Sequence, residues 1–308
     1  MSKTMLLFSG QGSQYVGMGK ELYDSSNSAK AVAKTACEVL GRDICSIMFS
    51  GPEQELNKTV NSQPAIMLCS LMALECAKEK GLEFDGVAGH SLGEYAALAA
   101  SGVVSVQDGF RLIKARAEAM QKAADENDGA MYAIIGPTVQ EIETACENTQ
   151  GYVVPVNYNS PVQTVIAGES AAAEAAAKLI SETSSAKRVK VVKLKVSSAF
   201  HSKLMQTAAD ELAEFAKKID FKTAEKEFYS NVSGEKLTDF SAMPQLLAKH
   251  IVSPVKFTSE LAAMHKTGYT DYIELGPGKV LTGLVKKTLD DVRAVNVENV
   301  ETLAKAFE

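Results

Sequence analysis

A serine held between two glycines, in the segment Gly89-His90-Ser91-Leu92-Gly93, is the residue of this chain best suited to covalent chemistry. The short apolar run before it, Asp85 to Gly89, predicts the end of a buried strand, and the alanine-rich segment after it, Tyr95 to Ala100, predicts a helix. Such a sharp turn exposes the serine hydroxyl, and the free N–H groups that begin the helix would stabilise an oxyanion beside it. The alternative interpretation is a loop of glycine and serine that only caps the helix.

A serine hydroxyl becomes a good nucleophile when a base removes its proton, and this chain has four histidines for that role. His90 is adjacent to Ser91 and is expected to support the turn, whereas His265 is expected to be exposed in the last turn of a helix. We prefer His201 to His250 as the base, because His201 lies where an inserted segment returns to the rest of the chain and clefts form at such junctions. No Asp occupies an evident strand-end loop between Ser91 and His201. A backbone carbonyl or an amide side chain is therefore expected to orient the histidine.

Arg116 is the one charged residue predicted to face inward from its helix. The segment Ser105-Val106-Gln107-Asp108 is close to a capping box and opens a helix that runs to about Asp125. The apolar stripe of this helix places most other charges on the opposite side, but Arg116 shares a flank with Leu112 and Ala119. Two interpretations are open: an arginine that reaches solvent or pairs with a nearby carboxylate, and a guanidinium that binds an anion inside a pocket.

The remaining segments predict an α/β protein with an insertion. A strand at Met5–Phe8 ends in a glycine-rich turn, where the backbone can approach a ligand closely. From residue 130 to 196 the predicted order is β-α-β-β-α-β, that of a ferredoxin-like unit. We therefore predict a large α/β-hydrolase-like domain with a parallel sheet core, residues 1–127 and 197–308, and an inserted ferredoxin-like subdomain, residues 128–196. Further helices are predicted over residues 28–40, 62–80, 203–218, 256–267 and 279–288, and further strands over 189–196, 271–275 and 294–297.

Composition narrows the class of protein. With 308 residues, 46% of them hydrophobic and 23% charged, the chain has ample length to bury a core. Its net charge of −6 argues against a nucleic-acid-binding protein, and no apolar run approaches the roughly 18 residues of a membrane span. The N-terminal residues lack the layout of a secretory signal. The five cysteines show no C-x-x-C spacing and no Cys/His cluster, so we expect reduced thiols, a cytoplasmic location and no metal site.

Five motifs occur in the order typical of one family. They are Phe8-Ser9-Gly10-Gln11-Gly12-Ser13-Gln14, Gly89-His90-Ser91-Leu92-Gly93-Glu94, Arg116, Ala199-Phe200-His201-Ser202 and Glu274-Leu275-Gly276-Pro277-Gly278. Over essentially its whole length, the chain resembles the malonyl-CoA:acyl carrier protein transacylases of bacterial fatty acid synthesis. The resemblance implies a cytoplasmic, monomeric enzyme without a cofactor. Such an enzyme moves a malonyl group from malonyl-CoA to the phosphopantetheine thiol of holo acyl carrier protein, by a ping-pong mechanism through a malonyl-serine.

The resemblance also implies roles for individual residues. Ser91 would carry the malonyl group, His201 would be its general base, and Arg116 would bind the malonyl carboxylate. The backbone amides of Gln11 and Leu92 would form the oxyanion hole. In the segment Asn61-Ser62-Gln63-Pro64, the side chain of Gln63 would line the site.

One residue departs from the family pattern. Where this chain has His250, the family usually has Gln or Asn, at a position that orients the catalytic histidine through its main-chain carbonyl. Because any residue supplies a carbonyl, activity is expected to survive.

Other functions stay open. A serine esterase or patatin-like hydrolase is one, since Asp128-Gly129-Ala130 resembles the Asp-Gly-Ala of a Ser–Asp dyad. An acyltransferase of polyketide synthesis is another. A carrier-protein docking module would share the fold but would not need Ser91 and His201 together. The basic residues that could dock an acidic carrier protein are Lys187, Arg188, Lys190 and Lys193, or Lys286 and Lys287.

Overall fold

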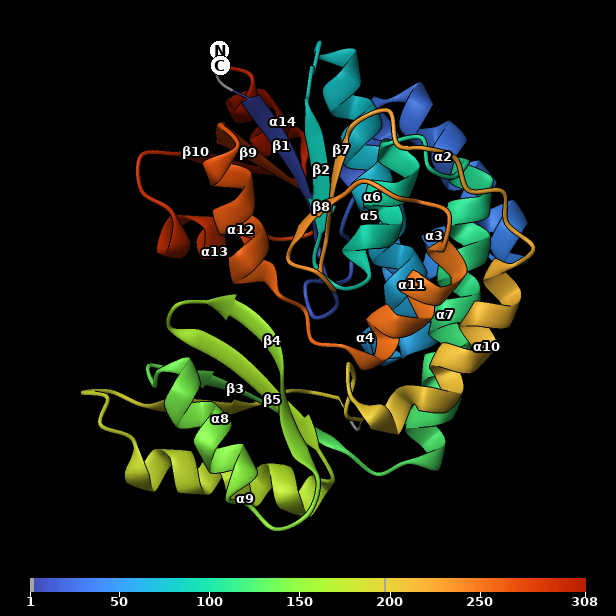
Figure 1. The fold of residues 1–308 in the computed structure, drawn as a ribbon. Coiled ribbons are helices and arrows are strands. Elements are labelled where there is room, and N and C mark those ends of the chain that lie inside the picture. Colours follow the sequence, from blue (N-terminus) through green and yellow to red (C-terminus); the bar gives the residue numbers. More distant parts are fainter. Residues whose placement is uncertain (1–2, 197) are drawn as a thin grey trace.

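Two β-sheets with helices packed on them make up the computed structural model, which describes residues 3–196 and 198–308 (Figure 1). The larger sheet has the strand order β10-β9-β1-β2-β7-β8, and its neighbours are parallel except in the β7–β8 hairpin. Its strands are β1 (Lys3–Phe8), β2 (Gly86–Gly89), β7 (Glu227–Ser230), β8 (Glu235–Leu237), β9 (Tyr269–Leu275) and β10 (Arg293–Val297). The predicted α/β class with a parallel sheet core is confirmed.

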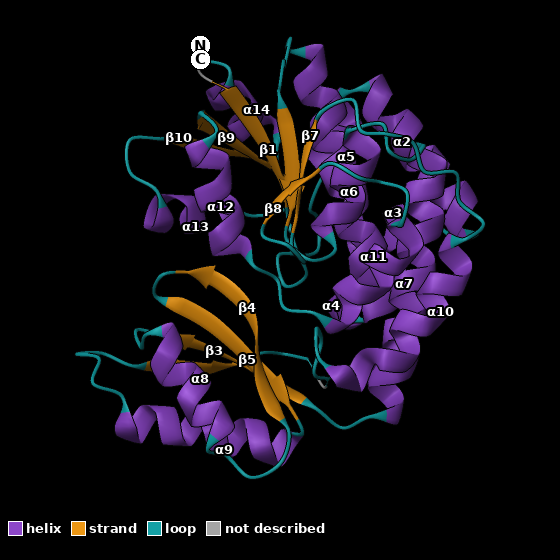
Figure 2. Ribbon diagram, in the orientation of Figure 1, coloured by secondary structure: helices purple, strands orange, loops and turns teal. Residues whose placement is uncertain are grey.

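Helices cover both faces of the larger sheet, because its central strands are apolar on both sides (Figure 2). In β1, Leu6 and Phe8 face one core cluster, whereas Met5 and Leu7 face another, and all four are fully buried. The second cluster is closed by α12 (Phe257–Lys266) and α13 (Val280–Thr288). The first cluster contacts α1 (Lys20–Ser25), α2 (Asn27–Leu40), α3 (Ile44–Ser50), α4 (Glu53–Asn57), α5 (Thr59–Glu79), α6 (Gly93–Ala100), α7 (Val106–Glu126), α10 (Gln206–Ala216), α11 (Met243–Val252) and α14 (Val300–Ala306).

The smaller sheet is antiparallel, with the strand order β4-β5-β3-β6 that defines the predicted ferredoxin-like unit. Its elements are β3 (Ala130–Ile135), α8 (Val139–Glu147), β4 (Val153–Ser160), β5 (Gln163–Gly168), α9 (Ser170–Thr183) and β6 (Lys190–Lys193). Alternate residues of β3 face opposite ways. Tyr132 and Ile134 pack with α8 and α9, whereas Met131 and Ala133 join the core cluster of the larger sheet. One face of the smaller sheet is therefore turned toward the larger sheet, as Figure 1 shows.

Two predicted elements have different limits or geometry in the structure. The strand predicted to reach Val196 ends at Lys193, because the chain then leaves the sheet after a last hydrogen bond from the Leu194 N–H to the Met131 carbonyl. The helix predicted over residues 203–218 begins with a 3-10 turn, Lys203–Met205, and continues as α10. Both differences lie at the return from the smaller sheet to the larger one.

The predicted domain limits, at residues 127/128 and 196/197, stay a proposal. Met1, Ser2 and Ser197 lie outside the described residues. Within the residues that are described, no helix combines the length and the apolar character needed to cross a membrane.

Candidate active site

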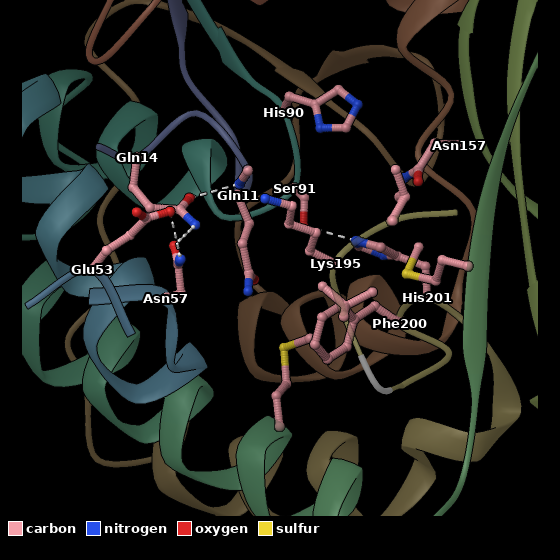
Figure 3. A pocket seen from close by; sticks show the side chains of 15 residues that line it. Gln11, Gln14, Glu53, Asn57, His90, Ser91, Asn157, Lys195, Phe200 and His201 are labelled. Carbon is pink, nitrogen blue, oxygen red and sulfur yellow. Dashed lines mark hydrogen bonds between the residues drawn. The ribbon is translucent and has the colours of Figure 1, made fainter. Parts of the chain in front are cut away.

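The serine of the Gly-x-Ser-x-Gly motif lies at a sharp turn between β2 and α6 (Figure 3). Ser91 has a φ of 54°, in the left-handed region that residues other than glycine rarely adopt. Steric packing allows only glycine at the two flanking positions. A Cβ added to Gly89 would lie 2.0 Å from the carbonyl carbon of Gly93, and one added to Gly93 would lie 2.0 Å from the backbone oxygen of Phe8. The motif therefore has the tight packing of a nucleophile elbow.

His201 lies beside the Ser91 hydroxyl, with 2.7 Å between its Nε2 atom and Ser91 Oγ. On the other side of the ring, Nδ1 is 3.0 Å from the backbone oxygen of His250 and 3.1 Å from that of Ser253. Since a carbonyl oxygen can only accept, Nδ1 carries the proton and Nε2 is free to accept the proton of the serine. Two backbone carbonyls thus orient the imidazole at the place where an α/β-hydrolase uses an acidic side chain.

Burial keeps the His201 imidazole neutral. Its side chain is almost fully buried, and desolvation, followed by the nearby positive charge of Arg116, lowers the pKa of His201 from 6.5 to about 3. A neutral imidazole can remove the proton of Ser91, whereas an imidazolium cannot. An anion bound beside Arg116 would offset the guanidinium charge and raise this pKa.

Arg116, on α7, is a buried cation that points at the same hydroxyl. Its Nη2 atom donates to Ser91 Oγ at 3.0 Å, and its Cζ atom lies 5.3 Å from the centre of the Tyr95 ring. The residue is 1% exposed, so the interpretation in which Arg116 reaches solvent is wrong. Its Nε atom lacks a hydrogen-bond partner, and within the described residues no carboxylate forms an ion pair with it. Because a buried charge without an oppositely charged partner is costly, this guanidinium is suited to receive an anion.

Two backbone N–H groups near the serine are free to stabilise an oxyanion. The N–H of Ser91 itself is engaged, because it donates to Asn231 Oδ1 at 2.7 Å. By contrast, none of the hydrogen bonds formed by the described residues uses the backbone N–H of Gln11 or Leu92. Leu92 immediately precedes α6, so its N–H is among the free donors at the start of that helix.

The side chain of Gln63 stands behind the cavity wall. Its Nε2 atom is 3.3 Å from Gln11 Oε1 and 3.6 Å from Met120 Sδ, and both of these residues line the cavity. Gln63 is fully buried, and its Oε1 atom has no hydrogen-bond partner. Gln63 therefore reaches the site through Gln11 and Met120.

A cavity of about 360 Å³ opens beside the serine, between the two sheets (Figure 3). Figure 3 shows Ser91 and His201 facing each other, with Phe200 below them and Gln14, Glu53 and Asn57 grouped to one side. The cavity wall is formed by Gln11, Gly12, Gln14, Glu53, Asn57, His90, Ser91, Met120, Met131, Asn157, Leu194, Lys195, Val196, Phe200 and His201. A cavity of this size, partly apolar and with a few convergent polar groups, is typical of a small-molecule site.

A buried hydrogen-bond network beneath the serine holds the elbow, and sequence reasoning missed its centre, Asn231. The Asn231 Nδ2 atom donates to the Gly89 carbonyl at 2.7 Å and to Glu260 Oε1 at 2.6 Å. Its backbone N–H donates to Glu94 Oε1 at 2.5 Å. Together with the bond from the Ser91 N–H, these contacts tie the end of β7 to both sides of the elbow. Because β7 was not predicted, no signal in the sequence pointed to Asn231.

The His250 ring belongs to this network and not to the cavity. Its Nε2 atom is 3.1 Å from Asn231 Oδ1, and its Nδ1 atom is 3.3 Å from Glu94 Oε2. Burial raises the pKa of Glu94 to about 8 and lowers the pKa of His250 well below 6.5. At neutral pH the His250 ring is therefore neutral and the Glu94 carboxyl is largely protonated. Since the Asn231 oxygen can only accept, His250 Nε2 donates to it. The departure from Gln or Asn at this position is thus accommodated beneath the elbow.

The other two histidines lie as predicted. His90 connects the elbow to the smaller sheet, because its Nε2 atom is 2.7 Å from Oδ1 of Asn159 at the end of β4. The edge of its ring packs against Phe257, with 5.5 Å between ring centres. His265 is exposed in the last turn of α12.

Comparisons with known proteins point to one family. A family model described as acyl transferase domain matches residues 5–305. The malonyl CoA-acyl carrier protein transacylase of Bacillus subtilis is 40% identical, over 100% of this chain and 97% of its own length. That of Escherichia coli is 38% identical over 100% of both chains. A crystal structure of the transacylase from Clostridium perfringens matches with a TM-score of 0.93 at 38% identity, over 99% of this chain and 96% of that chain. A malonyl-transacylase in complex with its type II polyketide acyl-carrier protein matches with a TM-score of 0.94 at 37% identity, over 99% of both chains.

Proposed function

The chain belongs to the acyl transferase domain family and is an acyltransferase, and we propose that it moves a malonyl group from malonyl-CoA to the phosphopantetheine thiol of holo acyl carrier protein. One observation carries the proposal: the Ser91 hydroxyl is 2.7 Å from a neutral histidine and 3.0 Å from a buried guanidinium. The histidine supports acyl transfer through the serine. The guanidinium supports an acyl group that ends in a carboxylate.

In the first half-reaction, His201 Nε2 takes the proton of Ser91 as Oγ attacks the thioester carbonyl of malonyl-CoA. The imidazole keeps its orientation because two backbone carbonyls hold its Nδ1–H group. The oxyanion lies between the N–H groups of Gln11 and Leu92, and one such donor is worth about 3 kcal/mol in the transition state. Collapse of the intermediate expels the coenzyme A thiolate, which takes the proton from His201, and leaves malonyl-Ser91.

In the second half-reaction, the same groups act in the reverse order. His201 removes the proton of the phosphopantetheine thiol as its sulfur attacks the ester carbonyl of malonyl-Ser91. The serine oxygen then leaves and recovers a proton from His201, and the malonyl group departs as a thioester of the carrier protein. Because both halves use one base and one pair of oxyanion donors, a single site supports the ping-pong sequence.

Arg116 selects the acyl group in this proposal. A guanidinium binds a carboxylate through two parallel N–H···O bonds, which an ammonium group cannot reproduce. The bound carboxylate also offsets the charge that helps to lower the pKa of His201. The base is therefore strengthened when a malonyl group, rather than an uncharged acyl group, occupies the site.

The hydrolase alternative lacks support from the geometry. Asp128 is exposed, and within the described residues it makes no hydrogen bond with Ser91, whose hydroxyl is engaged by His201 and Arg116. A polyketide carrier as acceptor has one observation in its favour, since the matched malonyl-transacylase complex contains a type II polyketide acyl-carrier protein. Fatty acid and polyketide carriers would use the same two half-reactions.

We also propose a cytoplasmic monomer without a cofactor. One chain supplies Ser91, His201 and Arg116, and the two half-reactions need no further group. The five cysteines are free thiols, as expected in a reducing compartment. Light scattering during size-exclusion chromatography tests the oligomeric state.

For the carrier protein, we favour docking on the basic residues around β6 over those on α13. Lys190 and Lys193 belong to β6, which is an edge strand, and the nearby Lys195 lines the cavity. Lys187 and Arg188 precede the strand and are exposed. Transfer to the carrier should weaken as salt concentration rises if this surface docks an acidic partner.

Intact-mass measurement tests the proposed function. After incubation with malonyl-CoA, the wild-type chain should gain one malonyl group and Ser91→Ala should gain none. Holo carrier protein should then remove the group, whereas the carrier without its phosphopantetheine arm should leave it in place. Release of free malonate without transfer would identify a hydrolase, and labelling of Ser91→Ala would rule out the assigned nucleophile.

A further inference from the structure

We propose that Cys37, Asp43 and Cys45 form a binding site for a thiophilic divalent cation such as Zn²⁺. Each side chain offers one ligand atom, and the three atoms lie within 4.8 Å of one another. Within the described residues, no other set of three such side chains comes this close together. From the sequence we expected no metal site, because the five cysteines show no C-x-x-C spacing and no Cys/His cluster.

Two of the three distances between the ligand atoms fit tetrahedral coordination, and the third, between Asp43 and Cys45, is within 4.8 Å. Zn–S bonds of about 2.3 Å place two thiolates about 3.8 Å apart, and a Zn–O bond of about 2.1 Å places an oxygen about 3.6 Å from each sulfur. In the structure, Cys37 Sγ is 3.7 Å from Cys45 Sγ and 3.9 Å from Asp43 Oδ1. A cation could therefore bind with small side-chain movements.

The backbone holds these side chains in place. Cys37 lies in the last turn of α2, which ends where Gly41 adopts the left-handed conformation and its N–H bonds to the Cys37 carbonyl at 3.0 Å. Asp43 is the N-cap of α3, because its Oδ1 atom accepts from the Ser46 N–H at 2.9 Å. A hydrogen bond from a group that does not itself bind the metal orients a ligating carboxylate. The second oxygen of Asp43 makes no hydrogen bond within the described residues.

The two thiols are accessible, unlike the other cysteines. Cys37 and Cys45 are half-buried, whereas Cys69, Cys76 and Cys146 are buried. A bound cation would displace the thiol protons to solvent, form two metal–thiolate bonds and one metal–carboxylate bond, and take water as its fourth ligand.

Titration of the reduced, full-length protein with Co²⁺ tests the site. We expect one saturable equivalent with an intense near-ultraviolet thiolate-to-cobalt band, which Zn²⁺ displaces. Cys37→Ser and Cys45→Ser should each bind Co²⁺ at least tenfold more weakly. Cys146→Ser, the matched control, removes a thiol elsewhere and should keep the band. A wild-type protein without a saturable band, or a band retained in both Cys37→Ser and Cys45→Ser, would overturn the proposal.

Thermal unfolding separates loss of the site from loss of the fold. Zn²⁺ should raise the Tm of the wild type and of Cys146→Ser but not that of Cys37→Ser, because only a native site binds the ion. Asp43→Asn retains the helix cap and should bind Co²⁺ more weakly, and unchanged affinity would exclude Asp43 as a ligand. Malonyl transfer should be unaffected in Cys37→Ser. The outcome for this site is therefore independent of the outcome for the proposed function.

Discussion

The Arg116 guanidinium donates to the Ser91 hydroxyl at 3.0 Å, so the cation proposed to bind the substrate carboxylate also touches the nucleophile. This contact links the choice of acyl group to the acylation step. In the free enzyme the guanidinium contributes, after burial, to the low pKa of His201. A bound carboxylate would engage the Arg116 guanidinium. The Ser91 hydroxyl would then lose its hydrogen bond from Arg116, and the pKa of His201 would rise at the same time.

Arg116→Ala should reduce kcat/KM for malonyl-CoA by about 100-fold, since it removes charge-assisted hydrogen bonds worth about 3 kcal/mol. Transfer from acetyl-CoA should fall much less, because an acetyl group has no carboxylate. Arg116→Lys keeps the charge but not the planar fork. Its kcat/KM for malonyl-CoA should therefore lie between that of the wild type and that of Arg116→Ala. The measurement is kcat/KM with both substrates for all three proteins. Equal losses for malonyl and acetyl transfer would make Arg116 a structural residue.

The pH dependence of stability should report on Glu94. Its pKa is about 8 in the folded chain against 4.5 for an ordinary glutamate, so the folded state holds an extra proton between these values. The stabilisation from this group is complete below pH 4.5 and is lost as the pH rises through 8. Glu94→Gln cannot titrate. Between about pH 6 and pH 8, its free energy of unfolding should therefore fall by about 2 kcal/mol less than that of the wild type. Urea unfolding at both pH values checks this, and parallel losses would contradict the raised pKa.

Gly93→Ala should severely destabilise the protein, because its Cβ would lie 2.0 Å from the backbone oxygen of Phe8, where neither strand nor helix can move freely. Gly283→Ala is the matched control. Gly283 also lies in a helix, but a Cβ there would have no atom within 4 Å, so this change should be neutral or stabilise α13 by up to about 1 kcal/mol. Thermal unfolding compares the two variants. A Gly93→Ala protein with wild-type Tm would show that the elbow is less tightly packed than described.

His250→Gln should retain malonyl transfer within about threefold, because the backbone oxygen that accepts from His201 does not depend on the side chain. Glutamine also keeps a hydrogen-bonding group facing Asn231 and Glu94. His250→Leu should lower both Tm and kcat, since Asn231 Oδ1 would lose one of its two hydrogen-bond donors and the buried Glu94 carboxyl would lose a polar neighbour. If His250→Gln lost activity as fully as Ser91→Ala, the His250 side chain would have a chemical role.

Structural features were predicted correctly from the sequence where they depend on residues close together in the chain. The Gly-x-Ser-x-Gly motif predicted the elbow, because tight turns exclude a Cβ at fixed positions. The helical period of the segment from Ser105 to about Asp125 predicted that Arg116 faces inward, because burial follows the apolar stripe. The strand order of the smaller sheet followed from its β-α-β-β-α-β pattern. The short strand β7 and the helix α11 were not predicted. Asn231, which follows β7, was therefore missed, whereas the family resemblance had already implied that the His250 carbonyl orients the catalytic histidine.

The amino-acid sequence by itself therefore established the α/β class, the serine at its turn and the inward arginine, since each depends on neighbours within a few residues. The folded chain established how these groups meet. His201 reaches Ser91 across 110 positions of sequence, and its ring is oriented by backbone oxygens of His250 and Ser253. Every residue has a carbonyl, so residue type carries no signal for such a contact. Periodicity likewise shows which face of an element is buried but not which distant segment covers it.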